Sequence, residues 1–308
     1  MFIEQGVRAT NRFWKYIVGS VVVILASVLG QVPLLVALKM DTATSVASVS
    51  LDSESVLHHF EPNISLFLVL LSFVFAMLGF YFVVTKLHQQ RFLSVTTSRS
   101  KVDWGRIFFA FGLWSLFTIV ATIVYYQLDP QSYQWNFKPV PFAILVVIAV
   151  VLIPFQTSTE EYVFRGYLMQ GFANLSGNKW FPLLMTSVIF GGLHLFNPEV
   201  AKLGNIIFVY YIGTGLFLGI LTLMDEGLEL ALGFHAANNC IGALLITSDW
   251  SAFQTHSILK EVAAPQSGLD VILPVVVVYP ILLYIFSCKY QWTNWKQKLT
   301  AKIAPPKF

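Results

Sequence analysis

The chain is a succession of long apolar runs separated by short polar segments. A helix that crosses the hydrocarbon core of a bilayer needs about 20 mostly apolar residues. The runs that approach or reach this length are 16–38, 64–85, 107–127, 139–157, 180–196, 203–224, 227–247 and 271–288. The pattern therefore predicts an all-α, polytopic transmembrane helix bundle with about eight spans.

Composition supports a membrane location. Of the 308 residues, 56% are hydrophobic and only 11% are charged, whereas soluble domains carry about 25% charged residues. The net charge of +3 comes from basic residues that cluster between the apolar runs, which is typical of membrane topology. We therefore expect membrane lipids as partners and no nucleic acid.

The basic clusters also predict an orientation. They precede the first run, fill 86–106 and follow the last run, whereas the loops 40–63 and 248–270 are acidic or nearly neutral. Because Lys and Arg are enriched on the cytoplasmic side, both termini should be cytoplasmic. We expect residues 1–308 to form a single integral membrane domain, in the cell (inner) membrane of a bacterium or otherwise in the endoplasmic reticulum.

Three polar clusters stand out, because ionisable groups in spans are expensive and usually functional. The first, 158–165, follows the fourth run. Glu161 and Arg165 are four residues apart and can pair on one helix face, which leaves Glu160 available for chemistry. The alternative is a simple helix start, since Ser158 and Glu161 have capping-box spacing and Pro154 can kink a helix.

The second cluster ends at His194, which follows Gly191 and Gly192. A single histidine on an apolar helix is usually a hydrogen-bonded core residue. The glycines permit close helix packing, or alternatively make room for a substrate backbone.

The third cluster holds His235 and Asn239, one helical turn apart and projecting from the same face. Its structural alternative is a hydrogen-bond clamp between helices. Counted from the ends of the predicted runs, His235 lies about 12 Å deep, His194 about 21 Å deep and Glu160 near the surface. Either a helix boundary is wrong, or a break near Pro154 brings these depths together.

A carboxylate, two imidazoles and a carboxamide can activate water and stabilise an oxyanion. Glu160 could act as general base on a water that His194 also holds, with His235 and Asn239 donating to the oxyanion. Zinc is the alternative, with Glu160, His194 and His235 as candidate ligands. The chain has no HExxH motif, and we favour water activation without a metal.

These motifs resemble the CPBP intramembrane proteases, which include type II CAAX prenyl endopeptidases and bacteriocin-processing or immunity proteins. The family pattern is EExxxR, FxxxH and HxxxN, and this chain matches it in order between about 139 and 247. The matching residues are Glu160, Glu161, Arg165, Phe190, His194, His235 and Asn239. The resemblance implies the same four catalytic residues, with Glu161, Arg165 and Phe190 in support.

The resulting hypothesis is an intramembrane endopeptidase that cleaves a membrane-associated or lipidated protein or peptide. A prenylated CAAX substrate is the family's best-known case. The alternatives are a proton-coupled transporter that uses the same ionisable residues as a relay, and a catalytically silent immunity or scaffold protein.

Overall fold

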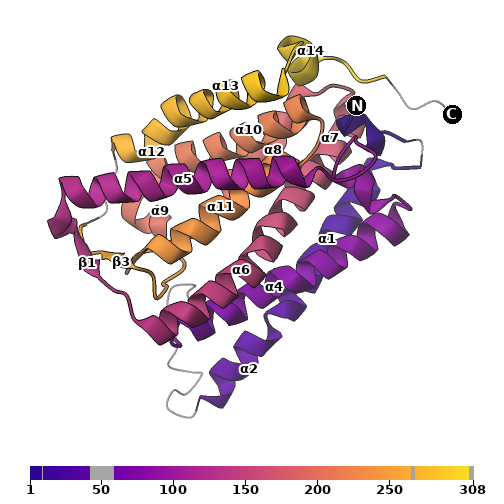
Figure 1. Cartoon of the computed structure of the whole chain (residues 1–308). Coiled ribbons are helices and arrows are strands. Elements are labelled where there is room, and N and C mark those ends of the chain that lie inside the picture. The colour runs from indigo at the N-terminus through magenta and orange to yellow at the C-terminus, as the bar shows by residue number, and fades with distance from the viewer. Residues whose placement is uncertain (9, 42–58, 265–267, 305–308) are drawn as a thin grey trace.

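A computed structural model describes residues 1–8, 10–41, 59–264 and 268–304 as a mostly helical bundle (Figure 1). The predicted all-α class is therefore confirmed in its main feature. The helices are α1 (Phe13–Gly30), α2 (Val32–Met40), α4 (Pro62–Phe82), α5 (Trp104–Leu128), α6 (Pro139–Glu161), α7 (Met169–Ser176), α8 (Trp180–Leu193), α9 (Pro198–Leu203), α10 (Ile207–Asp225), α11 (Glu229–Leu245), α12 (Leu269–Leu273), α13 (Tyr279–Tyr290) and α14 (Trp295–Thr300).

Within the described residues, six helical segments are long and apolar enough to cross a membrane. They are Phe13–Met40, Pro62–Leu87, Trp104–Leu128, Pro139–Ser176, Pro198–Asp225 and Leu269–Tyr290. The two other predicted spans correspond to α8 and α11, which have 14 and 17 residues. At about 1.5 Å per residue, each is shorter than the hydrocarbon core of a typical bilayer, so the count of eight spans stays a prediction.

The outer surface of the bundle is apolar. Ile24 and Leu29 on α1 are 61% and 62% exposed, and Val147 on α6 is 63% exposed. In water such a surface would be unfavourable, whereas lipid solvates it directly. Polar side chains instead lie inside, which is the distribution expected of an integral membrane protein.

The fourth predicted span ended too early. Helix continues from Pro139 to Ser176, through a π-helical stretch at Tyr162–Leu168. Pro154 lies inside α6 and does not end it, so the capping-box reading of Ser158 and Glu161 is wrong. Glu160 is about 32 Å along the helix from Pro139 and about 24 Å from Ser176, so it lies inside a continuous helical segment and not at a helix end.

A small three-stranded sheet adds to the helices and was not predicted. Its strands are β1 (Tyr133–Trp135), β2 (Ile246–Ser248) and β3 (Leu259–Glu261), in the order β1-β3-β2. β3 pairs antiparallel with β1 and parallel with β2. Figure 1 shows β1 and β3 at the end of the bundle opposite α14.

The N-terminal and C-terminal segments lie at the same end of the bundle (Figure 1). The Lys179 amine is 3.6 Å from Glu4, and the Lys298 amine is 3.5 Å from Glu226. This arrangement agrees with termini on one side, while the cytoplasmic assignment stays a prediction. Most of the acidic loop 40–63 used in that assignment lies outside the described residues.

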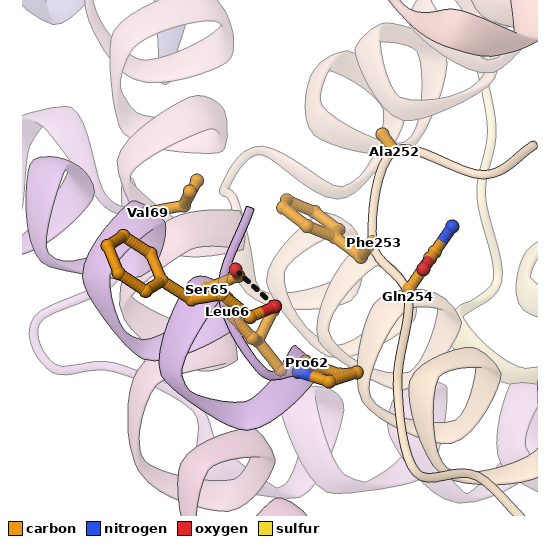
Figure 2. A pocket seen from close by; sticks show the side chains of 8 residues that line it. Pro62, Ser65, Leu66, Val69, Ala252, Phe253 and Gln254 are labelled. Atoms are coloured by element: carbon orange, nitrogen blue, oxygen red, sulfur yellow. Dashed lines mark hydrogen bonds between the residues drawn. The ribbon is translucent and has the colours of Figure 1, made fainter. Parts of the chain in front are cut away.

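A small cavity lies between the start of α4 and the loop after β2. Figure 2 shows Leu66 and Phe253 among its lining side chains, and the Ser65 hydroxyl donates to the Phe60 carbonyl at 3.3 Å. None of the seven motif residues lines this cavity. The candidate chemistry is therefore found elsewhere in the bundle.

Candidate active site

The first and third motifs meet between two adjacent helices. α6 carries Glu160 and Glu161, and α11 carries His235 and Asn239. α11 also packs against α5, and Figure 1 shows it between α5 and α6. Residues about 75 positions apart in the sequence therefore share one polar region inside an apolar bundle.

Glu161 and Arg165 form the predicted ion pair. The Arg165 Nη1 atom donates to Glu161 Oε1 at 2.9 Å, and both side chains are fully buried. Arg165 also donates to the Gly215 carbonyl at 3.3 Å, and its guanidinium lies 4.4 Å from the centroid of the Phe190 ring. These partners offset part of the cost of burying the charge. Among the described residues, Arg165 Nε and Glu161 Oε2 are buried without a hydrogen-bond partner.

His235 is held by Glu161 on one side and faces Glu160 on the other. Its Nδ1 atom is 2.7 Å from Glu161 Oε1, and its Nε2 atom is 3.7 Å from Glu160 Oε2. Because Glu161 Oε1 accepts from both Arg165 and His235, Nδ1 carries the hydrogen. In the neutral His235 ring, Nε2 therefore carries a lone pair and accepts hydrogen bonds. It can donate only when the ring is an imidazolium.

Glu160 is less buried than Glu161, and its side chain is 17% exposed. The Gln156 amide donates to Glu160 Oε1 at 2.5 Å. The second carboxylate oxygen is the one that faces His235. Among the described residues, no donor makes a direct hydrogen bond to this second oxygen, which fits a group that contacts water or substrate.

Asn239 is linked to the same glutamine. Its Nδ2 atom donates to Gln156 Oε1 at 2.9 Å, and its Oδ1 atom accepts from Asn238 Nδ2 at 3.0 Å. Asn238 Oδ1 in turn accepts from Trp114 Nε1 at 3.1 Å. Gln156 and Trp114 were not singled out from the sequence, although the helical spacing of Gln156 and Glu160 was a usable signal.

His194 lies at the C-terminal end of α8. It approaches the polar region between α6 and α11 through the Phe190 ring. Its Nδ1 atom is 2.7 Å from the Phe190 carbonyl, and its ring stacks on Tyr211 at 4.4 Å. In the described part of the chain, it makes no hydrogen bond to Glu160, His235 or Asn239. The Phe190 ring connects them, with its centroid 4.8 Å from that of His194 and 6.3 Å from that of His235.

The hydrogen bond of His194 fixes its tautomer. A carbonyl oxygen can only accept, so Nδ1 carries the hydrogen and Nε2 of the neutral ring has a free lone pair. That lone pair can accept a hydrogen bond from water. The backbone carbonyl of Phe190 therefore orients His194 in the same way that Glu161 orients His235.

The two glycines before His194 differ in their surroundings. A Cβ atom at Gly191 would lie 2.5 Å from an Ile212 side-chain atom, whereas a Cβ at Gly192 would meet nothing within 4 Å. The close-packing interpretation is confirmed for Gly191, which brings α8 against α10. It does not hold for Gly192.

The three candidate zinc ligands do not form a ligand cluster. Within the described residues, no group of three or more His, Cys, Asp and Glu side chains is arranged to hold a metal. The arrangement does not fit zinc bound by Glu160, His194 and His235 together, so no step of the chemistry proposed below uses a metal.

Comparison with known proteins bears on the same part of the chain. Residues 139–241 match the family described as type II CAAX prenyl endopeptidase Rce1-like. The chain is also 31% identical over 251 residues to the uncharacterized protein YyaK of Bacillus subtilis (strain 168), covering 81% of this chain and 83% of that protein. No solved structure matches. The family match spans all three polar motifs.

Proposed function

The chain belongs to the Rce1-like type II CAAX prenyl endopeptidase (CPBP) family, and from that premise we propose that it is an intramembrane endopeptidase. The substrate class is a membrane-associated or lipidated protein or peptide, which includes prenylated C-terminal peptides. The observation that carries the proposal is the constellation of Glu160, Glu161, His235 and Asn239 between α6 and α11. Its Glu161 and His235 side chains are buried, while Glu160 and Asn239 are half-buried.

In the proposed reaction, Glu160 takes a proton from water as the water oxygen attacks the scissile carbonyl carbon. The carbon–nitrogen bond then breaks, and Glu160 returns the proton to the departing amine. The products are a carboxylic acid and an amine, whose proton exchange in neutral water gives a carboxylate and an ammonium group. The exposed part of the Glu160 side chain supports this role, as does its Oε2 atom, which no donor among the described residues hydrogen-bonds directly. The Nε2 lone pair of His194 would hold the same water.

The oxyanion would be stabilised by His235 and Asn239. His235 can donate from Nε2 only as an imidazolium, because Nδ1 already donates to Glu161. Asn239 has one Nδ2 hydrogen on Gln156 and a second hydrogen to offer. A buried oxyanion donor contributes about 3 kcal/mol to transition-state stabilisation.

The replacement Glu160→Gln tests this role. It preserves size and the hydrogen bond from Gln156 but removes the base, so kcat should fall by at least about 100-fold. Purified full-length protein in nanodiscs is assayed on fluorogenic peptides with and without a prenyl group. Glu4→Gln, which changes a partly exposed glutamate at the termini end, is the control and should cleave at the wild-type rate.

Two outcomes would count against the proposal. Unchanged cleavage by Glu160→Gln would remove Glu160 from the mechanism. Proton or solute flux across sealed vesicles by a protein that cleaves no peptide would favour the transporter instead.

A further inference from the structure

A row of amide side chains connects the candidate site to a helix that carries none of the motif residues. It begins at Trp114 on α5, crosses Asn238 and Asn239 on α11, and reaches Gln156 and Glu160 on α6. The four hydrogen bonds measure 3.1, 3.0, 2.9 and 2.5 Å in that order.

The direction of this row is fixed by its two ends. An indole N–H can only donate, and a carboxylate oxygen can only accept. Turning the three amides over would place the Trp114 N–H against an amide N–H₂ and an amide oxygen against Glu160. Only one orientation satisfies all four bonds, so the side-chain amides have no equivalent flipped arrangement.

We propose that Gln156, Asn238 and Trp114 are positioning residues of this site, forming with Asn239 one directed hydrogen-bond relay that ends on Glu160. The inference rests on the proposed function and adds residues to its machinery. Gln156 is the central member, because its amide holds the Glu160 carboxylate with one end and the Asn239 amide with the other.

The relay sets the geometry of both reacting groups. With Oε1 of Glu160 held by Gln156, Oε2 is the oxygen that faces His235. Gln156 also accepts one Nδ2 hydrogen of Asn239. Because the amide group is planar, this bond fixes the direction in which the second Nδ2 hydrogen points. Base and oxyanion donor are thus oriented by one side chain.

The surroundings of the relay favour a rigid arrangement. Trp114 and Gln156 are 6% and 5% exposed, and the Trp114 ring packs 4.5 Å from that of Phe234. Polar groups in an apolar interior are expensive unless paired, and chains of hydrogen bonds strengthen one another. The relay gives these amides hydrogen-bond partners and ends on the buried Trp114 indole.

The kinetic test uses a substitution that breaks the hydrogen bonds of the relay but keeps the length of the side chain. Gln156→Met has similar length but makes none of the bonds, so kcat should fall by about 100-fold with KM nearly unchanged, because Glu160 and Asn239 lose alignment. Trp114→Phe should lower kcat by about 10-fold. The double variant should be little worse than Gln156→Met, since both changes break one chain.

Matched controls separate positioning from general packing. Gln170→Met also removes a buried, hydrogen-bonded glutamine, on α7. Trp292→Phe also removes a buried indole donor, which bonds Asp225. Both should lower the unfolding temperature and leave kcat unchanged. A kcat for Gln156→Met equal to that of the wild type would overturn the proposal.

A second measurement does not depend on activity. In ¹⁵N-tryptophan-labelled protein, the indole proton resonance missing from Trp114→Phe identifies Trp114. The relay predicts that Gln156→Met moves this resonance upfield, whereas Gln170→Met leaves it in place. An unmoved resonance overturns the relay. A moved resonance in a protein that cleaves no peptide would keep the relay and reject the endopeptidase.

Discussion

At the scale of single residues, spacing along the sequence predicted a contact within one helix. It could not predict the contacts between helices. The four-residue spacing of Glu161 and Arg165 predicted their ion pair, which is present at 2.9 Å. The bond between Gln156 and Asn239 joins residues 83 positions apart. No local period relates them, because it depends on how α6 packs against α11.

The Glu161–Arg165 pair gives a stability prediction. Glu161→Gln leaves the fully buried Arg165 without its counter-charge, and should lower the free energy of unfolding by about 3 kcal/mol. The double variant Glu161→Gln/Arg165→Met removes both charges and should recover part of this loss. Thermal unfolding in detergent measures both, and a double variant less stable than the single one would contradict the ion-pair account.

At the scale of helices, hydropathy located the long helical segments but placed the C-terminal end of the fourth one too early. The fourth apolar run stops near 157 in hydropathy, yet helix continues to Ser176, because buried partners satisfy the polar residues that follow. Glu160 thereby moves from a helix end to the middle of a long helical segment. The strands were missed because each has three residues, too few to show an alternating pattern.

Close packing of α11 against α5 gives a prediction with a control on the same helix. A Cβ atom at Gly233 would lie 2.1 Å from the Ile107 carbonyl oxygen, whereas one at Gly242 would meet nothing within 4 Å. Gly233→Ala should separate the helices, destabilise the fold by about 2 kcal/mol and impair His235 two residues away. Gly242→Ala should leave unfolding temperature and activity intact, and equal unfolding temperatures for the two variants would refute the packing argument.

At the scale of the whole molecule, partly buried ion pairs connect separate segments of the chain at the end of the bundle that holds both termini. Arg99 contacts Glu229 at 3.1 Å and Asp225 at 3.2 Å, and Arg106 also pairs with Asp225. The sequence suggested only a topological role for these arginines. Asp225 and Glu229 lie over 100 residues from these arginines, so this pairing could not be predicted from the local pattern. Arg106 also has a local partner in Asp103, at 3.1 Å.

A buried histidine at this end predicts a pH dependence. His88 donates from Nδ1 to Asn11 at 3.1 Å, and its Nε2 atom is 2.8 Å from the Tyr167 hydroxyl. Burial, followed by the nearby Lys15 charge, lowers the pKa of His88 from 6.5 to about 4. The unfolded chain therefore binds a proton first as pH falls, and His88 should destabilise the fold progressively between about pH 6.5 and about pH 4.

The slope from this one group is at most about 1.4 kcal/mol per pH unit. Unfolding temperatures of the wild type and His88→Gln between pH 4 and pH 8 measure it. The wild type should lose more stability than the variant as pH falls. Parallel curves would exclude His88 as the source.

The central claim is that this protein hydrolyses peptide bonds with Glu160 as the base. The most direct measurement is mass spectrometry of prenylated and unprenylated peptides incubated in ¹⁸O-labelled water with nanodisc-reconstituted wild type or Glu160→Gln. The account predicts a wild-type product whose new C-terminal carboxylate carries one ¹⁸O atom, and no such product from Glu160→Gln. Equal yields of the labelled product from both proteins, or no labelled product from the wild type with any peptide, would contradict it.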